Sequence, residues 1–282
     1  MGTSSSSKGS PSNVPMVPPW APDPLPPDTG GDGGDNGEND AEPTNAIPPS
    51  QSTPVPVAPA GRFGPARTSL GSFARTGSGE DMRRGVGHYA GKGLGGSRTG
   101  ARRLSGTART AGTLFGALSA MAAGQAPTVG SPLDPALLAG RSADEVMDAI
   151  VEAVRPVDGT QDGEASREAI SKALSELLDQ YPDADLLDLS EEQRLYAVER
   201  YIACDVFNRF RLDVGKTIQE KAPSALSGVA RLKEVRDYIT QTIAAAFRKH
   251  TAGGTNLGAR KVAAIAHESL IEALDVFQDY LS

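Results

Sequence analysis

The start of the chain carries the first candidate for chemistry, a primary amine on a residue without a side chain. Gly2 follows Met1, so we expect an aminopeptidase to remove Met1 and to expose the Gly2 amine. Thr3 and Ser4 begin a run of small residues up to Ser7, and such an end can thread into a narrow active site. The same letters match the N-myristoylation pattern M-G-x-x-x-S. Because this pattern is short and no polybasic segment follows, we do not favour lipidation.

Groupings typical of catalytic or metal sites are incomplete in this sequence. Glu191 and Glu192 fit a solvated helix face or a helix cap in an acidic region. His267 and Glu268 lack the second histidine of H-E-x-x-H, and no E-x-x-H pairs for a di-metal bundle occur. Cys204, the single cysteine, fits a small buried residue; a Cys–His pair stays open, although no spacing supports it. We therefore expect no enzyme, with no catalytic residue, metal or cofactor.

The letters GKGLGG at Gly91–Gly96 match the dinucleotide-binding pattern G-x-G-x-x-G. The pattern has meaning only between a strand and a helix, with an acidic residue about 20 residues later. Arg83–Ala90 show no strand pattern, and Ala101–Gly116 contain no acidic residue. We reject a dinucleotide site.

Charge divides the chain into three parts. The net charge is −6 over residues 1–60, +8 over residues 61–130 and −9 over residues 131–282. The basic middle part offers candidate contact residues, which are Arg98, Arg102, Arg103 and Arg109. Three roles stay open for it: contact with an acidic protein surface, including this chain's own C-terminal part, binding of nucleic-acid phosphates, or a solvated linker. We favour protein contact, because sparse aromatic residues weaken a base-stacking platform.

Composition separates residues 1–60 from the rest. They contain 14 prolines and 7 glycines but only 6 residues drawn from Leu, Ile, Val and Phe. Such a segment cannot bury enough apolar surface to offset its chain entropy, so we expect a disordered, extended tail. Its exception is VPMVPPWAP, with the only tryptophan of the chain, Trp20. A tryptophan among prolines suits a partner's groove, so we favour Val17, Pro18, Pro19 and Trp20 as a recognition segment over a solvated tail.

The spacing of apolar residues predicts an all-α fold. A weak helix is expected over Thr99–Ala123, where each of three glycines lowers its stability by up to ~1 kcal/mol, so that it forms only when packed. Ser142-x-x-Glu145 and Ser190-x-x-Gln193 are capping boxes that open two later helices.

Further helices are expected over about Glu164–Gln180, up to Lys221 after a break near Gly215, over Ala225–His250 and over Gly258–Leu281. No segment alternates long enough to be a strand. We therefore predict a bundle of five to six helices over residues 131–282, a basic, small-residue, conditionally ordered and partly helical segment over residues 61–130, and a disordered Pro/Gly-rich tail over residues 1–60. Aromatic and arginine residues are dense from Tyr196 to Arg211, where core packing alone and core packing with an interface stay open.

Hydropathy and the first residues bear on location. The longest apolar run is far shorter than the ~20 residues of a membrane helix. No basic start leads into an apolar core, so we see no secretory signal. We expect a cytoplasmic protein without a membrane partner.

Three stretches of the sequence are similar to one bacterial family. They are the start MGTSS followed by VPMVPPWAPD, the stretch GHYAGKGLGGSRTGARRLSGTARTAG, and the pair DVGKTIQEKAPS and RLKEVRDYI. Together they resemble the QatB family, the non-enzymatic component of the four-gene Qat anti-phage defence system. The resemblance spans nearly the whole chain and is least distinctive over Gly30–Ala60.

This resemblance implies partners, namely an ATPase, a QueC-like enzyme and a TatD-like nuclease. QueC chemistry activates a 7-deazaguanine carboxylate with ATP and captures it with ammonia, and a protein amine in place of ammonia would leave an amide. Gly2 would supply that amine, Thr3–Ser7 would thread the active site, and Pro15–Pro22 with Trp20 would grip the enzyme surface. An α-amine with a pKa near ~8 is partly neutral at cellular pH, whereas a lysine near ~10.4 is not, which disfavours Lys8.

Overall fold

The computed structural model describes residues 15–17, 21, 57–126, 133–252 and 257–281. The first part of the body holds α1 (Gly64–Thr76), α2 (Gly79–His88), a π-helix η1 (Tyr89–Gly93), α3 (Ser97–Arg103) and α4 (Ser105–Ala122). The second part holds α5 (Pro135–Leu138), α6 (Ala143–Val154), α7 (Gln161–Gln180), α8 (Glu191–Phe210), a π-helix η2 (Arg211–Gly215), α9 (Lys216–Lys221), α10 (Ala225–Thr251), α11 (Ala259–Gln278) and a 3-10 turn η3 (Asp279–Leu281). The expected all-α fold is confirmed: the described residues form helices and one isolated bridge, between Pro15 and Val57.

Both predicted capping boxes are present. The Ser142 hydroxyl accepts the Glu145 backbone N–H while the Glu145 carboxylate accepts the Ser142 N–H, and Ser190 and Gln193 repeat the arrangement. These contacts satisfy N–H groups that a helix start leaves without partners.

Two boundaries differ from the prediction. The helix expected from Glu164 starts at Gln161, because Thr160 caps it by accepting the Gly163 N–H. The break expected near Gly215 is absent, since α8 continues through the π-helical turn η2 into α9.

The basic part contains more helix than its composition predicts. Helices α1 and α2 were not expected, and the single weak helix expected over Thr99–Ala123 is divided at Leu104 into α3 and α4. Ser78 caps α2 by accepting the Asp81 N–H. The glycines of this part allow close packing: a Cβ on Gly112 would lie 2.5 Å from the backbone oxygen of Ala259. Glycine weakens an isolated helix, but Gly112 allows α4 and α11 to approach each other closely.

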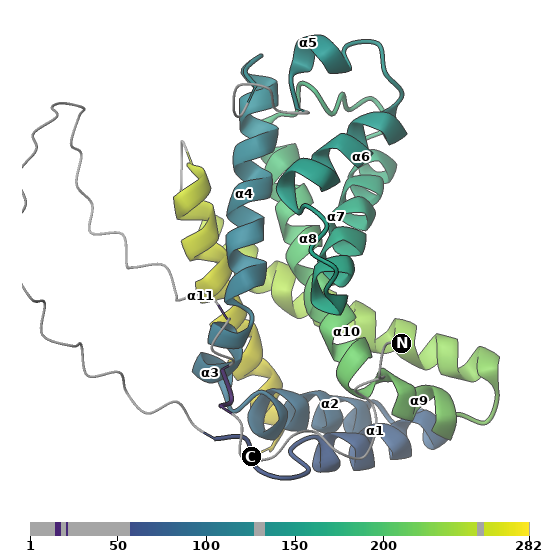
Figure 1. The fold of residues 1–282 in the computed structure, drawn as a ribbon. Coiled ribbons are helices and arrows are strands. Elements are labelled where there is room, and N and C mark those ends of the chain that lie inside the picture. Colours follow the sequence, from purple (N-terminus) through teal and green to yellow (C-terminus); the bar gives the residue numbers. More distant parts are fainter. Residues whose placement is uncertain (1–14, 18–20, 22–56, 127–132, 253–256, 282) are drawn as a thin grey trace, which may run out of the picture.

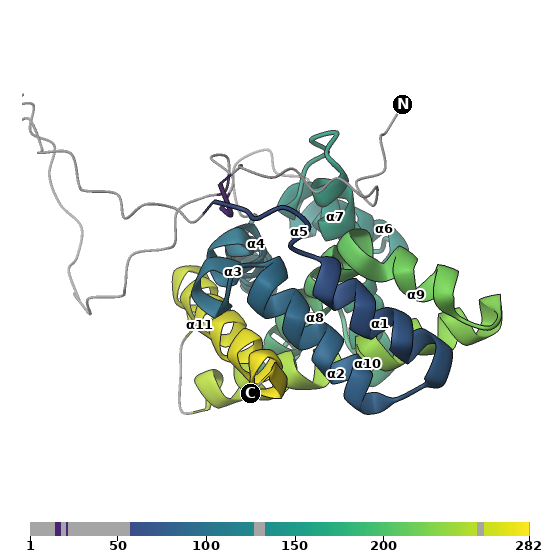
Figure 2. The same ribbon diagram turned by 90° about the horizontal axis from the view of Figure 1, so that it is seen from below.

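Residues 61–126 and the later helices share one hydrophobic core. The cluster runs from Phe63 to Phe277, and α11 packs along α4, α3 and α2. In Figure 1, α4, α6, α7 and α8 occupy the upper part and α1, α2 and α9 the lower part, while α10 and α11 contact helices of both groups. Figure 2 shows α11, α2 and α1 side by side. The partner against which the basic part packs is therefore this chain's own C-terminal part.

Within the described ranges, none of the helices combines the length and the apolar character needed to cross a membrane.

Candidate functional site: the seat of the N-terminal segment and the adjoining polar pocket

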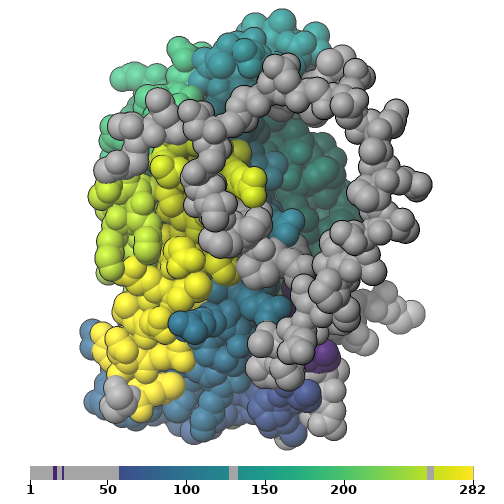
Figure 3. Space-filling view, turned by 90° about the vertical axis from the view of Figure 1, so that its left-hand side faces the viewer, coloured from purple at the N-terminus to yellow at the C-terminus, as the bar shows by residue number. Residues whose placement is uncertain are grey.

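A short piece of the N-terminal segment is bound on the helical body. Met16 and Val17 expose only 2% and 8% of their surfaces. Arg62 Nη1 lies 3.8 Å from the Met16 sulfur, and Arg103 donates a hydrogen bond to the Met16 backbone oxygen. Figure 3 shows this segment, in purple, against the blue residues of the first helices. We call the residues that hold Met16, namely Arg62, Gly95 and Arg103, the seat.

Gly95 makes room for Met16. It lies in the turn between η1 and α3 with a φ of 87°, a conformation that side chains with a Cβ rarely adopt. A Cβ at this position would lie 2.6 Å from Met16 Cε. The turn that resembles a dinucleotide motif by letters is therefore a surface for a methionine side chain, between two helical elements.

The seat rests on a buried aromatic and ionic cluster. The Arg62 guanidinium lies 4.8 Å from the centre of the Phe63 ring, which stacks at 5.8 Å on the ring of Tyr89. The Tyr89 hydroxyl donates a hydrogen bond of 3.0 Å to Asp213 in η2. Arg62 is thus linked through Phe63 and Tyr89 to Asp213 of η2.

Burial governs the titration of this cluster. It raises the pKa of Tyr89 well above its usual value, and the Asp213 carboxylate raises it further. Burial also raises the pKa of Asp213, against the hydrogen bond from Tyr89 and the positive charges of Arg103 and Arg62, which lower it. Desolvation and the neighbouring Arg103 lower the pKa of Arg62. Arg62 faces the Met16 sulfur, and Arg103 faces the Met16 backbone oxygen.

The free energies that hold this segment nearly balance. Burying two apolar side chains contributes about 3–6 kcal/mol, and two hydrogen bonds add about 1–3 kcal/mol. Ordering three residues costs about 3–6 kcal/mol, and closing the chain between Pro15 and Val57 costs about 3 kcal/mol. Because the two sides agree to within a few kcal/mol, the loss of one contact shifts the segment toward release.

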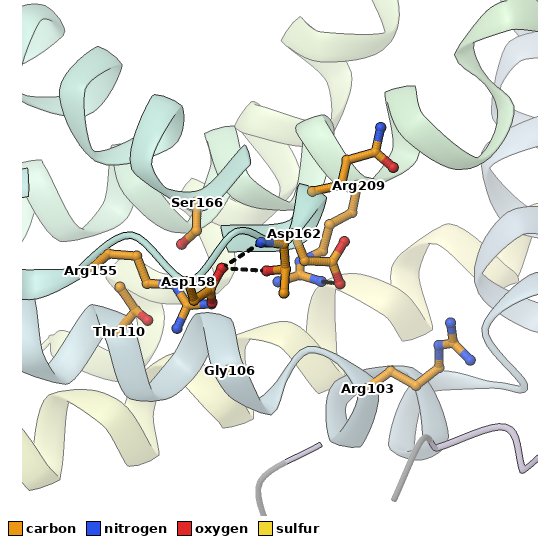
Figure 4. Close-up of a pocket in the computed structure, with 10 residues that line it drawn as sticks. Arg103, Gly106, Thr110, Arg155, Asp158, Asp162, Ser166 and Arg209 are labelled. Atoms are coloured by element: carbon orange, nitrogen blue, oxygen red, sulfur yellow. Dashed lines mark hydrogen bonds and ion pairs between the residues drawn. The ribbon is translucent and has the colours of Figure 1, made fainter. Parts of the chain in front are cut away.

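A polar pocket of about 520 Å³ adjoins the seat. Arg103 belongs to both, since it lines the pocket and also binds Met16. The remaining lining comes from α4, the loop before α7, α7 and α8, and consists of Gly106, Thr110, Arg155, Asp158, Thr160, Gln161, Asp162, Ser166 and Arg209 (Figure 4).

Most charges around this pocket are already paired. Arg209 binds Asp162 at 2.9 Å and the fully buried Asp205 at 3.1 Å, and Thr107 donates to Asp205 at 2.5 Å. These carboxylates raise the pKa of Arg209, which stays protonated. Arg155 binds Asp158 at 2.7 Å.

The Ser166 hydroxyl of the pocket has no base beside it in Tyr201. The Ser166 hydroxyl lies 2.8 Å from that of Tyr201, and burial raises the pKa of Tyr201, so Tyr201 is no base for Ser166 at neutral pH. The Thr160 hydroxyl donates a hydrogen bond of 2.6 Å to Asp158 and caps α7 by accepting the Gly163 N–H. Such a pocket can bind and orient a polar group. Across the described ranges, no group of three or more His, Cys, Asp or Glu residues could hold a metal ion.

The structure brings together two of the residues singled out in the sequence. Val17 is buried beside Met16, which Arg103 binds. Arg102 is half-buried, whereas Arg98 and Arg109 are exposed. The other candidates lie outside the described residues; they are Gly2, Thr3, Ser4, Pro18, Pro19 and Trp20.

Other sequence interpretations have clear outcomes. Cys204 is the buried residue that we expected, and burial raises its pKa to about 11. Glu191 and Glu192 lie in the first turn of α8, as a helix-capping role predicts. The sequence analysis missed Met16, although it lies in the segment we singled out, because nothing in its neighbours indicates which distant residues enclose it.

One of the comparisons with known proteins finds a match. A profile described as QatB, Qat anti-phage system associated protein QatB, matches residues 95–277, about two thirds of the chain. The chain belongs to the QatB family. The match begins at Gly95 of the seat and ends at Phe277 of the core. Its family makes this QatB chain a component of an anti-phage defence system. Searches of curated proteins and of solved structures found no match.

Proposed function

We propose that this QatB chain is the partner and the N-terminal modification substrate of a QueC-like, ATP-dependent enzyme. Its family membership places it in the Qat system, and the resemblance of its first residues supports the N-terminus as the modified part. The observation that carries the proposal furthest is the seat, because Met16 is held on the helical body and Gly2 lies only 14 residues before it. The ATPase and the TatD-like nuclease are further proposed partners.

The proposed reaction forms an amide at Gly2. ATP activates a 7-deazaguanine carboxylate so that one carboxyl oxygen becomes a leaving group. The neutral Gly2 nitrogen attacks the carbonyl carbon, the activated oxygen leaves with its bonding electrons, and the nitrogen loses one proton. An α-amine with a pKa near ~8 supplies enough neutral nucleophile at cellular pH, whereas Lys8 does not. The chain acts as substrate and scaffold, and the catalytic groups belong to the partner.

Intact-mass measurement tests this proposal. The wild-type chain is co-expressed with the QueC-like partner. The Gly2→Pro and Lys8→Arg variants of the chain are co-expressed with the same partner. We expect a mass increase equal to the carboxylic acid minus one water in the wild type and in Lys8→Arg, and no increase in Gly2→Pro. An unmodified Gly2, or a modified Gly2→Pro, contradicts the proposal.

Nucleic-acid binding by residues 61–130 is the alternative, and its support is weaker. Several basic side chains of this part are engaged within the chain: Arg103 binds Met16, Arg67 donates to the Asp213 backbone oxygen, and Arg84 pairs with Glu80 and Asp81. Arg98 and Arg109 are exposed, and Arg98 is the basic residue that favours it most, because Arg109 also has an interaction within the chain. Salt-dependent binding of DNA or RNA that is lost on replacing Arg98 and Arg109 would support this alternative.

A further inference from the structure

The N-terminal segment meets the helical body at a residue whose side chain is enclosed. Met16 is 2% exposed, with Arg62 at its sulfur and Arg103 at its backbone oxygen. We propose that Met16 is an anchor that sets the reach of the Gly2 amine and thereby the rate at which an enzyme docked on the helical body modifies it. The reaction in this inference rests on the proposed function. The anchoring of Met16 is inferred from the contacts of the seat alone.

Chain length converts the anchor into a defined reach. Gly2 lies 14 residues before Met16. At most about 50 Å of extended chain therefore separates the amine from the seat. The active site of the docked enzyme must lie within this distance of Met16.

Release of Met16 would lengthen the tether fourfold. After Met16 and the adjacent Val17, the next buried residue among those that the structure describes is Ala58, which is 1% exposed and lies 56 residues after Gly2. The composition of residues 1–60 predicts a tether without regular structure, for which effective concentration falls roughly as the −3/2 power of length. A fourfold longer tether thus lowers the effective concentration of the amine about eightfold.

Two glycines allow the anchor to be released with a matched control. An alanine Cβ at Gly95 would lie 2.6 Å from Met16 Cε and 3.1 Å from Thr99 Cγ2, at a φ of 87°. Gly140 has a similar φ of 78°, and a Cβ there would have no atom within 4 Å. Gly95→Ala and Gly140→Ala therefore impose a similar backbone strain, and only Gly95→Ala displaces the end of the Met16 side chain from the seat.

The first experiment measures occupancy of the seat without any partner. Hydrogen peroxide oxidises exposed methionine, so the oxidation rate of Met16, read by peptide mass spectrometry, is compared with that of a synthetic peptide of residues 10–22. We expect Met16 in the full chain to react at least tenfold more slowly than the peptide, Gly95→Ala to remove this protection, and Gly140→Ala to keep it. Circular dichroism and thermal unfolding confirm that both variants fold. Oxidation of wild-type Met16 at the peptide rate overturns the anchor.

The second experiment measures the reaction with the QueC-like partner. We expect Gly95→Ala to lower the modification rate of Gly2 about eightfold and Gly140→Ala to leave it unchanged. Deleting residues 23–50 from Gly95→Ala halves its tether to Ala58, and this should raise the rate to within about threefold of the wild type. The same deletion in the anchored wild type should leave the rate unchanged, because Met16 still fixes the reach.

The outcomes separate the two proposals. Equal modification rates in the wild type and in a Gly95→Ala variant with unprotected Met16 overturn the role of the anchor alone. The role of the anchor is also overturned if deleting residues 23–50 does not restore the modification rate of Gly95→Ala. A damaged docking surface would give that result. A wild type with protected Met16 and unmodified Gly2 overturns the proposed function, and with it the part that the anchor plays in the reaction.

Discussion

The hydroxyl of Tyr89 donates a hydrogen bond of 3.0 Å to the carboxylate of Asp213, 124 residues later in the chain. Tyr89 opens the π-helical turn η1, and Asp213 lies in the π-helical turn η2. The bond therefore joins the only two π-helical turns of the described residues across the core. Tyr89 is buried and Asp213 is half-buried, so the Tyr89 hydroxyl has no exposed surface on which to find another partner.

Removing the Tyr89 hydroxyl should destabilise the fold. Tyr89→Phe removes this donor from the half-buried Asp213 carboxylate, and we expect the free energy of unfolding to fall by about 1–2 kcal/mol. Tyr181→Phe is the matched control, because its hydroxyl bonds at 3.3 Å to an exposed carboxylate, that of Glu192. Urea unfolding should show less than about 0.5 kcal/mol of change for the control. Equal effects of both substitutions would contradict the assignment.

Asp213 should make stability depend on pH with a defined sign. Burial raises its pKa above the usual 3.8 in the folded state, so the folded chain binds more protons than the unfolded chain in the interval between the two values. The stability contributed by this group therefore declines as pH rises through that interval. Asp213→Asn lacks the titrating group. The free energy of unfolding of this variant minus that of the wild type should therefore increase from pH 3.8 upward and then become constant. Urea unfolding at a series of pH values measures this difference, and a flat difference would refute it.

The close approach of α4 and α11 should make two glycines of one helix respond in opposite ways. Gly112→Ala places a Cβ 2.5 Å from the Ala259 backbone oxygen, whereas Gly106→Ala meets no atom within 4 Å. We expect the first to destabilise by about 1–3 kcal/mol through overpacking. The second should stabilise by up to about 1 kcal/mol through helix propensity. Thermal unfolding of both variants decides, and a stabilising Gly112→Ala would be inconsistent with this packing.

Removing the cation of the buried ion pair beside the polar pocket should destabilise the fold. Arg209→Met leaves the fully buried Asp205 without its cation, and we expect a loss of about 3–5 kcal/mol. Arg211→Met is the control, because Arg211 pairs at 3.0 Å with Glu168 and both side chains are largely exposed. The control should lose no more than about 1 kcal/mol. Denaturant midpoints that fall equally in both variants would refute the difference.

The helices of the C-terminal part could be predicted because their signals are local. Ser142 and Ser190 open capping boxes, and large apolar residues recur at helical spacing after each. Helices α1 and α2 carry a weaker signal, because each buries only two large apolar side chains, and small residues fill the rest of their packed faces. The Ser78 cap with Asp81 in the first turn was the available sign of α2.

The seat depends on contacts that are distant in sequence. Met16 is enclosed by residues from position 62 onward, and no local pattern specifies which groups approach a methionine in a proline-rich segment. The left-handed backbone of Gly95 is likewise visible only in the structure, because a glycine in a sequence does not show which atom fills the space of its absent side chain.

The mass of the N-terminal peptide tests the central claim most directly. The full chain is purified after co-expression with the QueC-like partner, and the peptide that begins at Gly2 is compared with the same peptide from cells without the partner. The account predicts that the partner adds one 7-deazaguanine carboxylic acid minus one water to the Gly2 nitrogen. An unmodified Gly2 amine in the presence of the active partner would contradict it.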